Sequence, residues 1–167
     1  MVATPDDVVA LTALLGRPPN AEFQVVVRGA TGEPIVIRNA PLTRDGTPMP
    51  TRYWLVARDL SAAVSRLESS GGVRAAEAAV DPQALQAAHD AYAAERDAAL
   101  PPGHSGPRPH GGVGGTRKGV KCLHAHYASF LANGTDPVGA WVASALASDG
   151  RIYGDLPTPK RGGGGAA

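Results

Sequence analysis

Glycine and proline occur so often along this chain that much of it must be loop. Its 167 residues include 21 glycines and 15 prolines, a far larger share than globular proteins usually contain. Glycine weakens regular structure and proline interrupts it, so each cluster of the two marks a loop or the end of an element. The length suits one domain, and the segments between the clusters suit a domain with a modest core.

Three short segments in the first third of the chain have the composition of β-strands. They cover residues 23–27, 35–37 and 51–56 and are rich in β-branched and aromatic side chains, which favour strands. The Thr31-Gly32 turn predicts a hairpin between the first two segments. Residues 39–50 contain three prolines and Asp45-Gly46, so we predict a loop there. Such local connections predict a small antiparallel sheet.

The rest of the chain carries helix signals, mainly capping residues followed by apolar side chains at helical spacing. Strands followed by helices predict an α+β domain, with a sheet of about three strands and four to six helices packed mainly on one face. We expect this domain to span residues 1–149 and residues 150–167 to form a disordered tail. The expected helices run from Pro5 to Leu15, from Asp59 as cap to Ser70, from Val73 to Val80, from Pro82 to about Leu100, from Thr116 or Arg117 to about Leu131, and from Pro137 onward.

Composition excludes several functional classes. The formal net charge of +1 provides no overall attraction to nucleic acid, so we do not expect nucleic-acid binding. No apolar run approaches the roughly 18 residues of a membrane span, and the first residues are acidic rather than signal-like. We therefore expect a cytoplasmic protein that does not bind membranes. The single cysteine excludes an internal disulfide and a metal site built from several thiolates.

The segment richest in potential chemistry joins a glycine-rich loop, Gly111–Gly115, to the predicted helix that follows. Thr116, Arg117, Lys118 and Lys121 lie at this junction. Free backbone N–H groups at a helix start, with cations nearby, favour an anion. The Gly-Lys-Ser/Thr ending of a Walker A loop is missing. The pattern predicts a site for a phosphate- or carboxylate-bearing small molecule; the alternative is a solvated basic segment.

Two arginines from the sheet and one histidine from the helix would complete this pocket. Arg38 ends one predicted strand and Arg52 lies in the next, so the two could hold an oxyanion at one sheet edge. The alternative is that both simply face solvent. On the predicted helix, His124 lies on the same edge as Arg117 and Lys121. If the pocket is catalytic, His124 is the expected general acid/base, and the basic groups stabilise developing negative charge.

Cys122 supports two further hypotheses. With His126 on the same edge of the predicted helix, it could be a catalytic nucleophile whose thiolate the neighbouring cations favour. The same pair, with His104 or His110 from the preceding loop, could instead bind a metal. Cys122, His124 and His126 cannot all share one ion, because side chains two residues apart diverge on a helix. A half-buried structural cysteine is the ordinary alternative; we predict no metal, and the sequence defines no cofactor.

Several stretches resemble the uncharacterised bacterial family DUF501. The most specific is Val120–His124, followed by Asp136–Gly139. The others are residues 15–19, 39–41, 45–51, 65–68 and 94–97. The resemblance implies a bacterial protein of a family without established activity or ligand. Genes of the family commonly lie near those of a septum-formation initiator, enolase and an exopolyphosphatase, which implies a link to cell division or phosphate metabolism.

Some members of that family carry a second cysteine after the arginine that corresponds to Arg28. This chain has Gly29 at that position. A metal or redox site that uses two cysteines is therefore not expected here.

A non-enzymatic interaction protein, with a partner in cell division or envelope growth, is the alternative function. Its contact surface would be the Tyr53-Trp54 strand edge or the last helix with Trp141. A contiguous apolar patch on the outside favours this alternative, whereas buried tryptophans and a basic loop that faces a cleft favour ligand binding. The sequence does not decide whether the protein is an enzyme. Our principal expectation is an anion pocket in which Arg38, Arg52, Lys121 and His124 converge.

Overall fold

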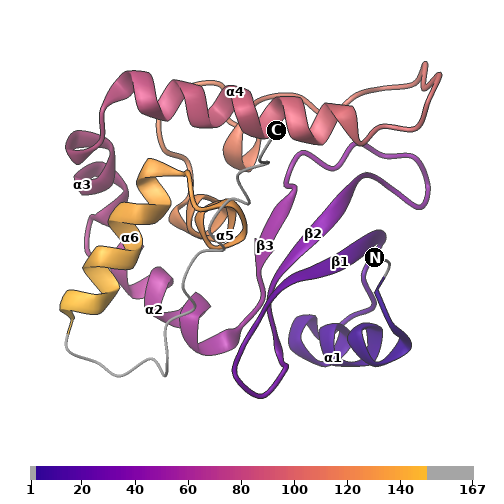
Figure 1. Ribbon diagram of the computed structural model, residues 1–167, viewed down its shortest axis with the longest axis horizontal. Coiled ribbons are helices and arrows are strands. Elements are labelled where there is room, and N and C mark those ends of the chain that lie inside the picture. Colours follow the sequence, from indigo (N-terminus) through magenta and orange to yellow (C-terminus); the bar gives the residue numbers. More distant parts are fainter. Residues whose placement is uncertain (1–2, 150–167) are drawn as a thin grey trace, which may run out of the picture.

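A three-stranded antiparallel sheet stands at the centre of the fold, with helices on both of its faces (Figure 1). The computed structural model describes residues 3–149, so the predicted disordered tail lies outside the described residues. The strands lie in the order β1-β2-β3 and comprise β1 (Ala21–Arg28), β2 (Pro34–Thr43) and β3 (Tyr53–Leu55). The α+β class and the antiparallel three-stranded sheet that we predicted from the sequence are confirmed.

Within residues 3–149 six α-helices surround the sheet, and α1 lies apart from the other five (Figure 1). This arrangement confirms the prediction of four to six helices, most of them on one face. No described helix is both long and apolar enough to cross a membrane. The helices are α1 (Pro5–Leu15), α2 (Arg58–Ser69), α3 (Gly72–Ala79), α4 (Pro82–Ala98), α5 (Leu123–Asn133) and α6 (Pro137–Ser148), and a short 3-10 turn, η1 (Val113–Gly115), precedes α5.

Helix α1 covers one face of the sheet. It begins in a capping box in which the Thr4 hydroxyl accepts a hydrogen bond from the Asp7 N–H at 3.2 Å and the Asp7 carboxylate accepts one from the Thr4 N–H at 3.0 Å. It ends at Gly16, whose φ of 71° gives a left-handed C-cap. The small apolar cluster beneath it consists of Leu11, Phe23, Ile37 and Val56.

The main core lies on the opposite face. Ile37 pairs with Trp54 and Val36 with Leu55 across strands β2 and β3. Because side chains alternate along a strand, Ile37 and Trp54 pack toward α1, whereas Val36 and Leu55 pack toward the main core. From the helices, this core takes buried side chains that include Leu60, Val64, Leu85, Tyr92, Leu123, Leu131, Val138 and Val142.

Strand β2 is longer than predicted. It continues to Thr43, so the prediction that residues 39–43 belong to a loop is wrong. Pro41 does not end the strand, because its carbonyl still accepts a hydrogen bond from the Met49 N–H at 2.8 Å. The Thr43 N–H likewise donates to the Thr47 carbonyl at 2.9 Å, which closes the following turn. In α2 the N-cap is Ala57, so Asp59 lies in the first turn instead of capping the helix.

The largest difference concerns residues 116–122, which we predicted as helix. Helix α5 begins at Leu123, with Cys122 as its N-cap. Gly119 adopts a φ of 66°, a left-handed conformation that interrupts an α-helix. The predicted alignment of Arg117 and Lys121 with His124 on one helical edge is therefore wrong, because the two basic residues precede the helix.

Candidate functional site

A pocket of about 330 Å³ lies beside strand β3 at the start of α5, and we call it the β3–α5 pocket. In the described sheet β3 pairs with β2 alone, so it is an edge strand. The pocket has an apolar wall from β3 and the end of α1, and a polar end from the segment that leads into α5. Its lining comprises Leu15, Thr51, Tyr53, Trp54, Leu55, Val56, Gly114, Lys121, Cys122, His124 and Ala125.

The polar end of the pocket is built on the first turn of α5. The Cys122 side chain makes no capping hydrogen bond at this helix start. The Leu123 N–H donates instead to Glu68 Oε1 of α2 at 2.6 Å. A carboxylate at this position also complements the positive end of the helix dipole. Glu68 thus joins α2 to α5 at the point where Cys122 and His124 reach the pocket.

Glu68, Cys122 and His124 bring an oxygen, a sulfur and a nitrogen together. His124 Nδ1 lies 3.8 Å from Cys122 Sγ and 3.2 Å from Glu68 Oε1. The other ring nitrogen, Nε2, lies 3.1 Å from the Ser61 carbonyl oxygen and 3.3 Å from Ser65 Oγ. All three donor atoms lie within 4.8 Å of one another.

The same contacts favour the protonated form of His124. The hydrogen bond with Cys122 contributes most, and the charge of Glu68 and the carbonyl of Ser61 add to it, so the pKa of His124 rises to about 9 although burial acts in the opposite direction. At neutral pH His124 is therefore an imidazolium that faces the pocket.

Sequence reasoning missed Glu68. It lies in one of the stretches that resemble DUF501, but nothing in the sequence connects it to Cys122, which is more than fifty positions away. The connection comes from the packing of α2 against α5, where the carboxylate replaces a side-chain cap. A helix start without its own capping side chain is the signal that could have suggested an external acceptor.

The structure does not bring Cys122 and His126 together. His126 is fully buried, and its Nδ1 lies 2.9 Å from Asp136 Oδ2. On the other side its ring packs edge-on against His89, with 5.5 Å between ring centroids. His110 is exposed on the preceding loop. Among the described residues the group in metal-binding range is Glu68, Cys122 and His124, so the alternative set of Cys122, His126 and His110 is not assembled.

Arg38 and Arg52 lie together, but at a different pocket. Both line a depression of about 210 Å³ that Lys121 and His124 do not line. Glu95 Oε1 lies 3.8 Å from Arg38 Nη1 and 3.4 Å from Arg52 Nε, so one carboxylate counters both guanidinium groups. The expected convergence of Arg38 and Arg52 with Lys121 and His124 is therefore absent.

The glycine-rich loop is closed by internal hydrogen bonds. The Gly112 N–H donates to the Thr116 carbonyl at 2.7 Å, and the Gly115 N–H donates to the Gly112 carbonyl at 2.9 Å. The Val113 N–H donates to His89 Nδ1 at 3.0 Å. With these amides occupied, the loop supports the fold and does not form an open cradle for an anion. Of its residues, Gly114 lines the β3–α5 pocket.

The basic residues before α5 are dispersed. Lys121 lines the β3–α5 pocket, and its Nζ lies 3.4 Å from the Gly114 carbonyl oxygen. Lys118 lines a separate pocket that includes Glu77. Arg117 is exposed, and the Thr116 hydroxyl donates to the Lys118 carbonyl at 2.8 Å. Among the six residues that we predicted to bind the ligand, Lys121 is the one that shares a described pocket with Cys122 and His124.

Comparison with known proteins places the chain in a family. The family described as "Protein of unknown function (DUF501)" matches residues 25–144. The chain belongs to DUF501. The match runs from β1 into α6 and includes Glu68, Lys121, Cys122 and His124. We found no match among curated proteins and none among solved structures.

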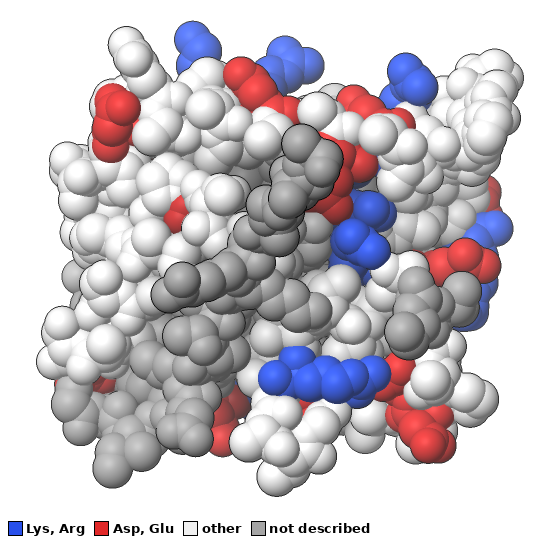
Figure 2. Space-filling view, in the orientation of Figure 1, with Lys and Arg blue, Asp and Glu red and all other residues white. Residues whose placement is uncertain are grey.

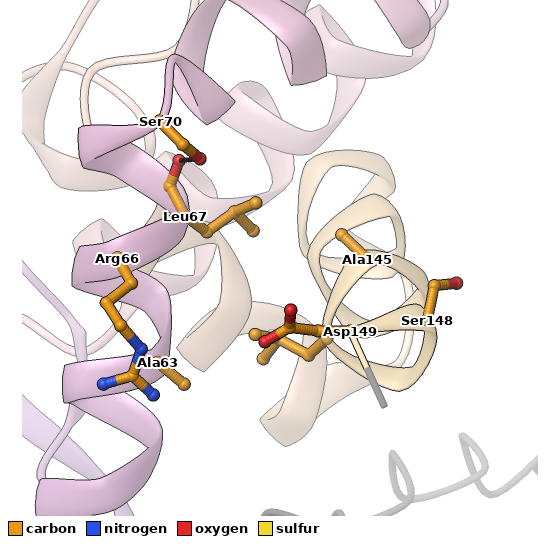
Figure 3. Close-up of a pocket in the computed structure, with 8 residues that line it drawn as sticks. Ala63, Arg66, Leu67, Ser70, Ala145, Ser148 and Asp149 are labelled. Atoms are coloured by element: carbon orange, nitrogen blue, oxygen red, sulfur yellow. Dashed lines mark hydrogen bonds between the residues drawn. The ribbon is translucent and has the colours of Figure 1, made fainter. Parts of the chain in front are cut away.

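The largest described pocket of this DUF501 protein lies elsewhere, between α2 and the end of α6 (Figure 3). It measures about 400 Å³, and its lining includes Arg66 of α2 and Asp149 after α6 but none of the site residues that we predicted from the sequence. Figure 2 shows basic and acidic side chains interspersed on the face in view, without an extended basic stripe. The β3–α5 pocket is therefore the candidate functional site.

Proposed function

We propose that this DUF501 protein binds a small molecule that carries a carboxylate or phosphate group in the β3–α5 pocket. The observation that carries the proposal is the convergence of Lys121, His124 and the N-terminus of α5 on one pocket with an apolar wall. Lys121 and the protonated His124 carry two positive charges at this end of the pocket, and Glu68, which lies against His124 and the start of α5, carries one negative charge. An anionic group placed there gains both charge attraction and hydrogen-bond donors.

The dimensions of the pocket support a small ligand. Its volume of about 330 Å³ lies at the lower end of the range of small-molecule sites, which is about 300 to 1,000 Å³. Trp54, Leu55 and Val56 belong to the apolar part of its lining. The ligand that fits this arrangement has an apolar body for the β3 wall and an anionic group for the start of α5.

The catalytic roles of His124 and Cys122 stay predictions. In a nucleophile–histidine–acid triad the nucleophile and the acid contact different ring nitrogens. Here Cys122 and Glu68 both face His124 Nδ1, while Nε2 faces the Ser61 carbonyl. This geometry supports binding more directly than it supports thiol catalysis.

The alternative of an interaction protein gains no support from exposed apolar groups. Trp54 and Trp141 are half-buried and pack against the two cores. Within the described residues, the exposed large hydrophobic side chain is Val9. A single such residue is ordinary for a protein surface and does not form a docking patch.

The proposal is tested by titrating the full chain with inorganic phosphate and with a short-chain carboxylate while backbone NMR signals are recorded. We expect the shifts to concentrate at residues 54–56 and 121–125. The Lys121→Gln variant should bind at least about 10-fold more weakly, because it loses one charge-assisted hydrogen bond. Lys118→Gln, which removes another exposed charge that lies outside the β3–α5 pocket, should bind like the wild type. Shifts confined to other residues, or equal losses in both variants, would contradict the proposal.

A further inference from the structure

We infer that Glu68, Cys122 and His124 are the protein ligands of a divalent transition-metal ion of the zinc class. The three side chains come from α2, from the N-cap of α5 and from its first turn, and they supply one oxygen, one sulfur and one nitrogen within 4.8 Å of one another. Carboxylate, thiolate and imidazole are the three side-chain groups that bind zinc in proteins. The inference goes beyond anion binding, because it assigns the protein a metal.

The distances between the donor atoms match the edges of a zinc coordination tetrahedron. With bonds of about 2.3 Å to sulfur and about 2.0 to 2.2 Å to nitrogen and oxygen, tetrahedral angles place sulfur about 3.6 Å from nitrogen and nitrogen about 3.4 Å from oxygen. The observed separations are 3.8 Å between Cys122 Sγ and His124 Nδ1, and 3.2 Å between His124 Nδ1 and Glu68 Oε1. These two separations need shifts of only a few tenths of an ångström, and the third, between Cys122 Sγ and the Glu68 carboxylate, is at most 4.8 Å.

Backbone groups hold two of the three ligands in orientation. His124 Nε2 lies 3.1 Å from the Ser61 carbonyl oxygen, so its N–H donates there, and the metal would displace the proton from Nδ1, which faces the sulfur. A histidine that binds a metal through one ring nitrogen usually donates from the other to a carbonyl or carboxylate. Glu68 Oε1 accepts from the Leu123 N–H at 2.6 Å, which fixes the carboxylate against the start of α5.

The donor set also indicates the kind of metal. One thiolate and one imidazole favour zinc and its first-row neighbours over magnesium and calcium, which prefer oxygen ligands. Three protein ligands leave one tetrahedral position open, as in catalytic zinc sites. Cys122 and His124 also line the β3–α5 pocket, so the ion would lie at its wall. We expect the open position to receive the anionic group of the ligand, and this part of the inference rests on the proposed function. Metal binding itself does not depend on the proposed function.

Cobalt(II) replaces zinc as a spectroscopic probe in the direct test. The full chain, stripped of metal and kept reduced with a phosphine, is titrated with Co²⁺ alone. We expect one ion per chain, a thiolate-to-cobalt charge-transfer band in the near ultraviolet, visible bands of tetrahedral intensity, and displacement by one equivalent of Zn²⁺. Because the chain holds a single cysteine, the charge-transfer band reports Cys122 alone. Its absence at stoichiometric Co²⁺ would overturn the inference.

Variants test the ligand set. Glu68→Gln, Cys122→Ser and His124→Gln should each weaken Co²⁺ binding at least about 100-fold, since even the loss of an outer partner costs about 10- to 100-fold. His110→Gln removes an exposed histidine from the preceding loop and should bind Co²⁺ like the wild type. If the charge-transfer band persists unchanged in both Glu68→Gln and His124→Gln, cobalt is bound by Cys122 without the other two side chains. That result would overturn the assignment of the three ligands.

The alkylation rate of Cys122 can be measured on the wild type, so this test does not depend on whether a variant folds. Zn²⁺ should slow the alkylation of Cys122 by at least about 10-fold, because the sulfur is then a metal ligand; an unchanged rate would contradict the site. Phosphate is then added to the cobalt-loaded chain. If cobalt binds but phosphate leaves the visible bands and the NMR signals unchanged, the proposed function fails and the metal site stands. If cobalt does not bind but phosphate shifts residues 121–125, the metal inference fails and the proposed function stands.

Discussion

His89 connects the long helix α4 to the loop that precedes α5. It is buried, and its Nδ1 accepts a hydrogen bond from the Val113 N–H at 3.0 Å. Its Nε2 therefore carries the proton and donates to the Gly119 carbonyl at 3.0 Å. Burial lowers the pKa of His89, and the neighbouring His126 lowers it further. A second proton would break the bond from Val113, so the neutral form is the one that holds the loop.

This histidine predicts that the protein loses stability in mild acid. The pKa of His89 is lower in the folded state than in the unfolded state. The unfolded chain therefore takes up protons first as the pH falls below about 6.5, and the free energy of unfolding decreases from there. We expect the wild type to lose more stability between about pH 8 and about pH 5 than His89→Gln.

Denaturant unfolding at several pH values measures the effect. Glutamine keeps one donor and one acceptor but does not titrate. His126, Asp136 and Asp90, which lie near His89, are present in both proteins and so cancel in the comparison. Parallel pH profiles for the two proteins would contradict the prediction.

At the scale of elements, helix starts were predictable where the capping signal is local. Thr4, Asp81 and Asp136 cap α1, α4 and α6 through their own side chains, each followed by a proline. These three helices begin where the sequence places them. The length of strand β2 was underestimated, because the hydrogen bonds that join its end to Met49 and Thr47 depend on a fold-back that composition does not reveal.

The start of α5, and with it the candidate site, could not be read from local signals. Cys122 has no capping hydrogen bond of its own, and the acceptor at this helix start is Glu68 on α2. Lys121, Cys122 and His124 are near neighbours in the sequence, and all three line the β3–α5 pocket. The sequence could not show that a carboxylate from another helix meets them, because that contact exists only after α2 and α5 pack.

The loop before α5 gives a prediction at the same scale. A Cβ at Gly112 would lie 2.5 Å from the Cβ of His89, whose backbone is fixed within α4. We expect Gly112→Ala to destabilise the protein by about 1 to 3 kcal/mol through overpacking, as measured by denaturant unfolding. Gly106→Ala is the matched control, since the added Cβ would meet only the half-buried loop side chain of His104, at 3.0 Å. Equal stabilities of the two variants would contradict this account of the loop.

At the scale of the whole molecule, the basic residues are distributed among separate sites. Arg38 and Arg52 share Glu95 on one side of the sheet, whereas Lys121 stands at the β3–α5 pocket. From the sequence we predicted that these residues share one pocket, because they lie near the ends of predicted strands and at the start of a predicted helix. The direction in which each basic side chain points depends on the register of the strands and on the position of α4. Neither can be predicted from a short stretch of sequence.

The most direct test of the central claim compares phosphate binding by two charge variants, measured by calorimetry on the full chain. Lys121→Gln removes the cation of the β3–α5 pocket, and Arg38→Gln removes one from the pocket that Glu95 already neutralises. We expect Lys121→Gln to lose at least about 10-fold in affinity and Arg38→Gln to bind like the wild type. The reverse order, with binding retained in Lys121→Gln and lost in Arg38→Gln, would contradict the central claim.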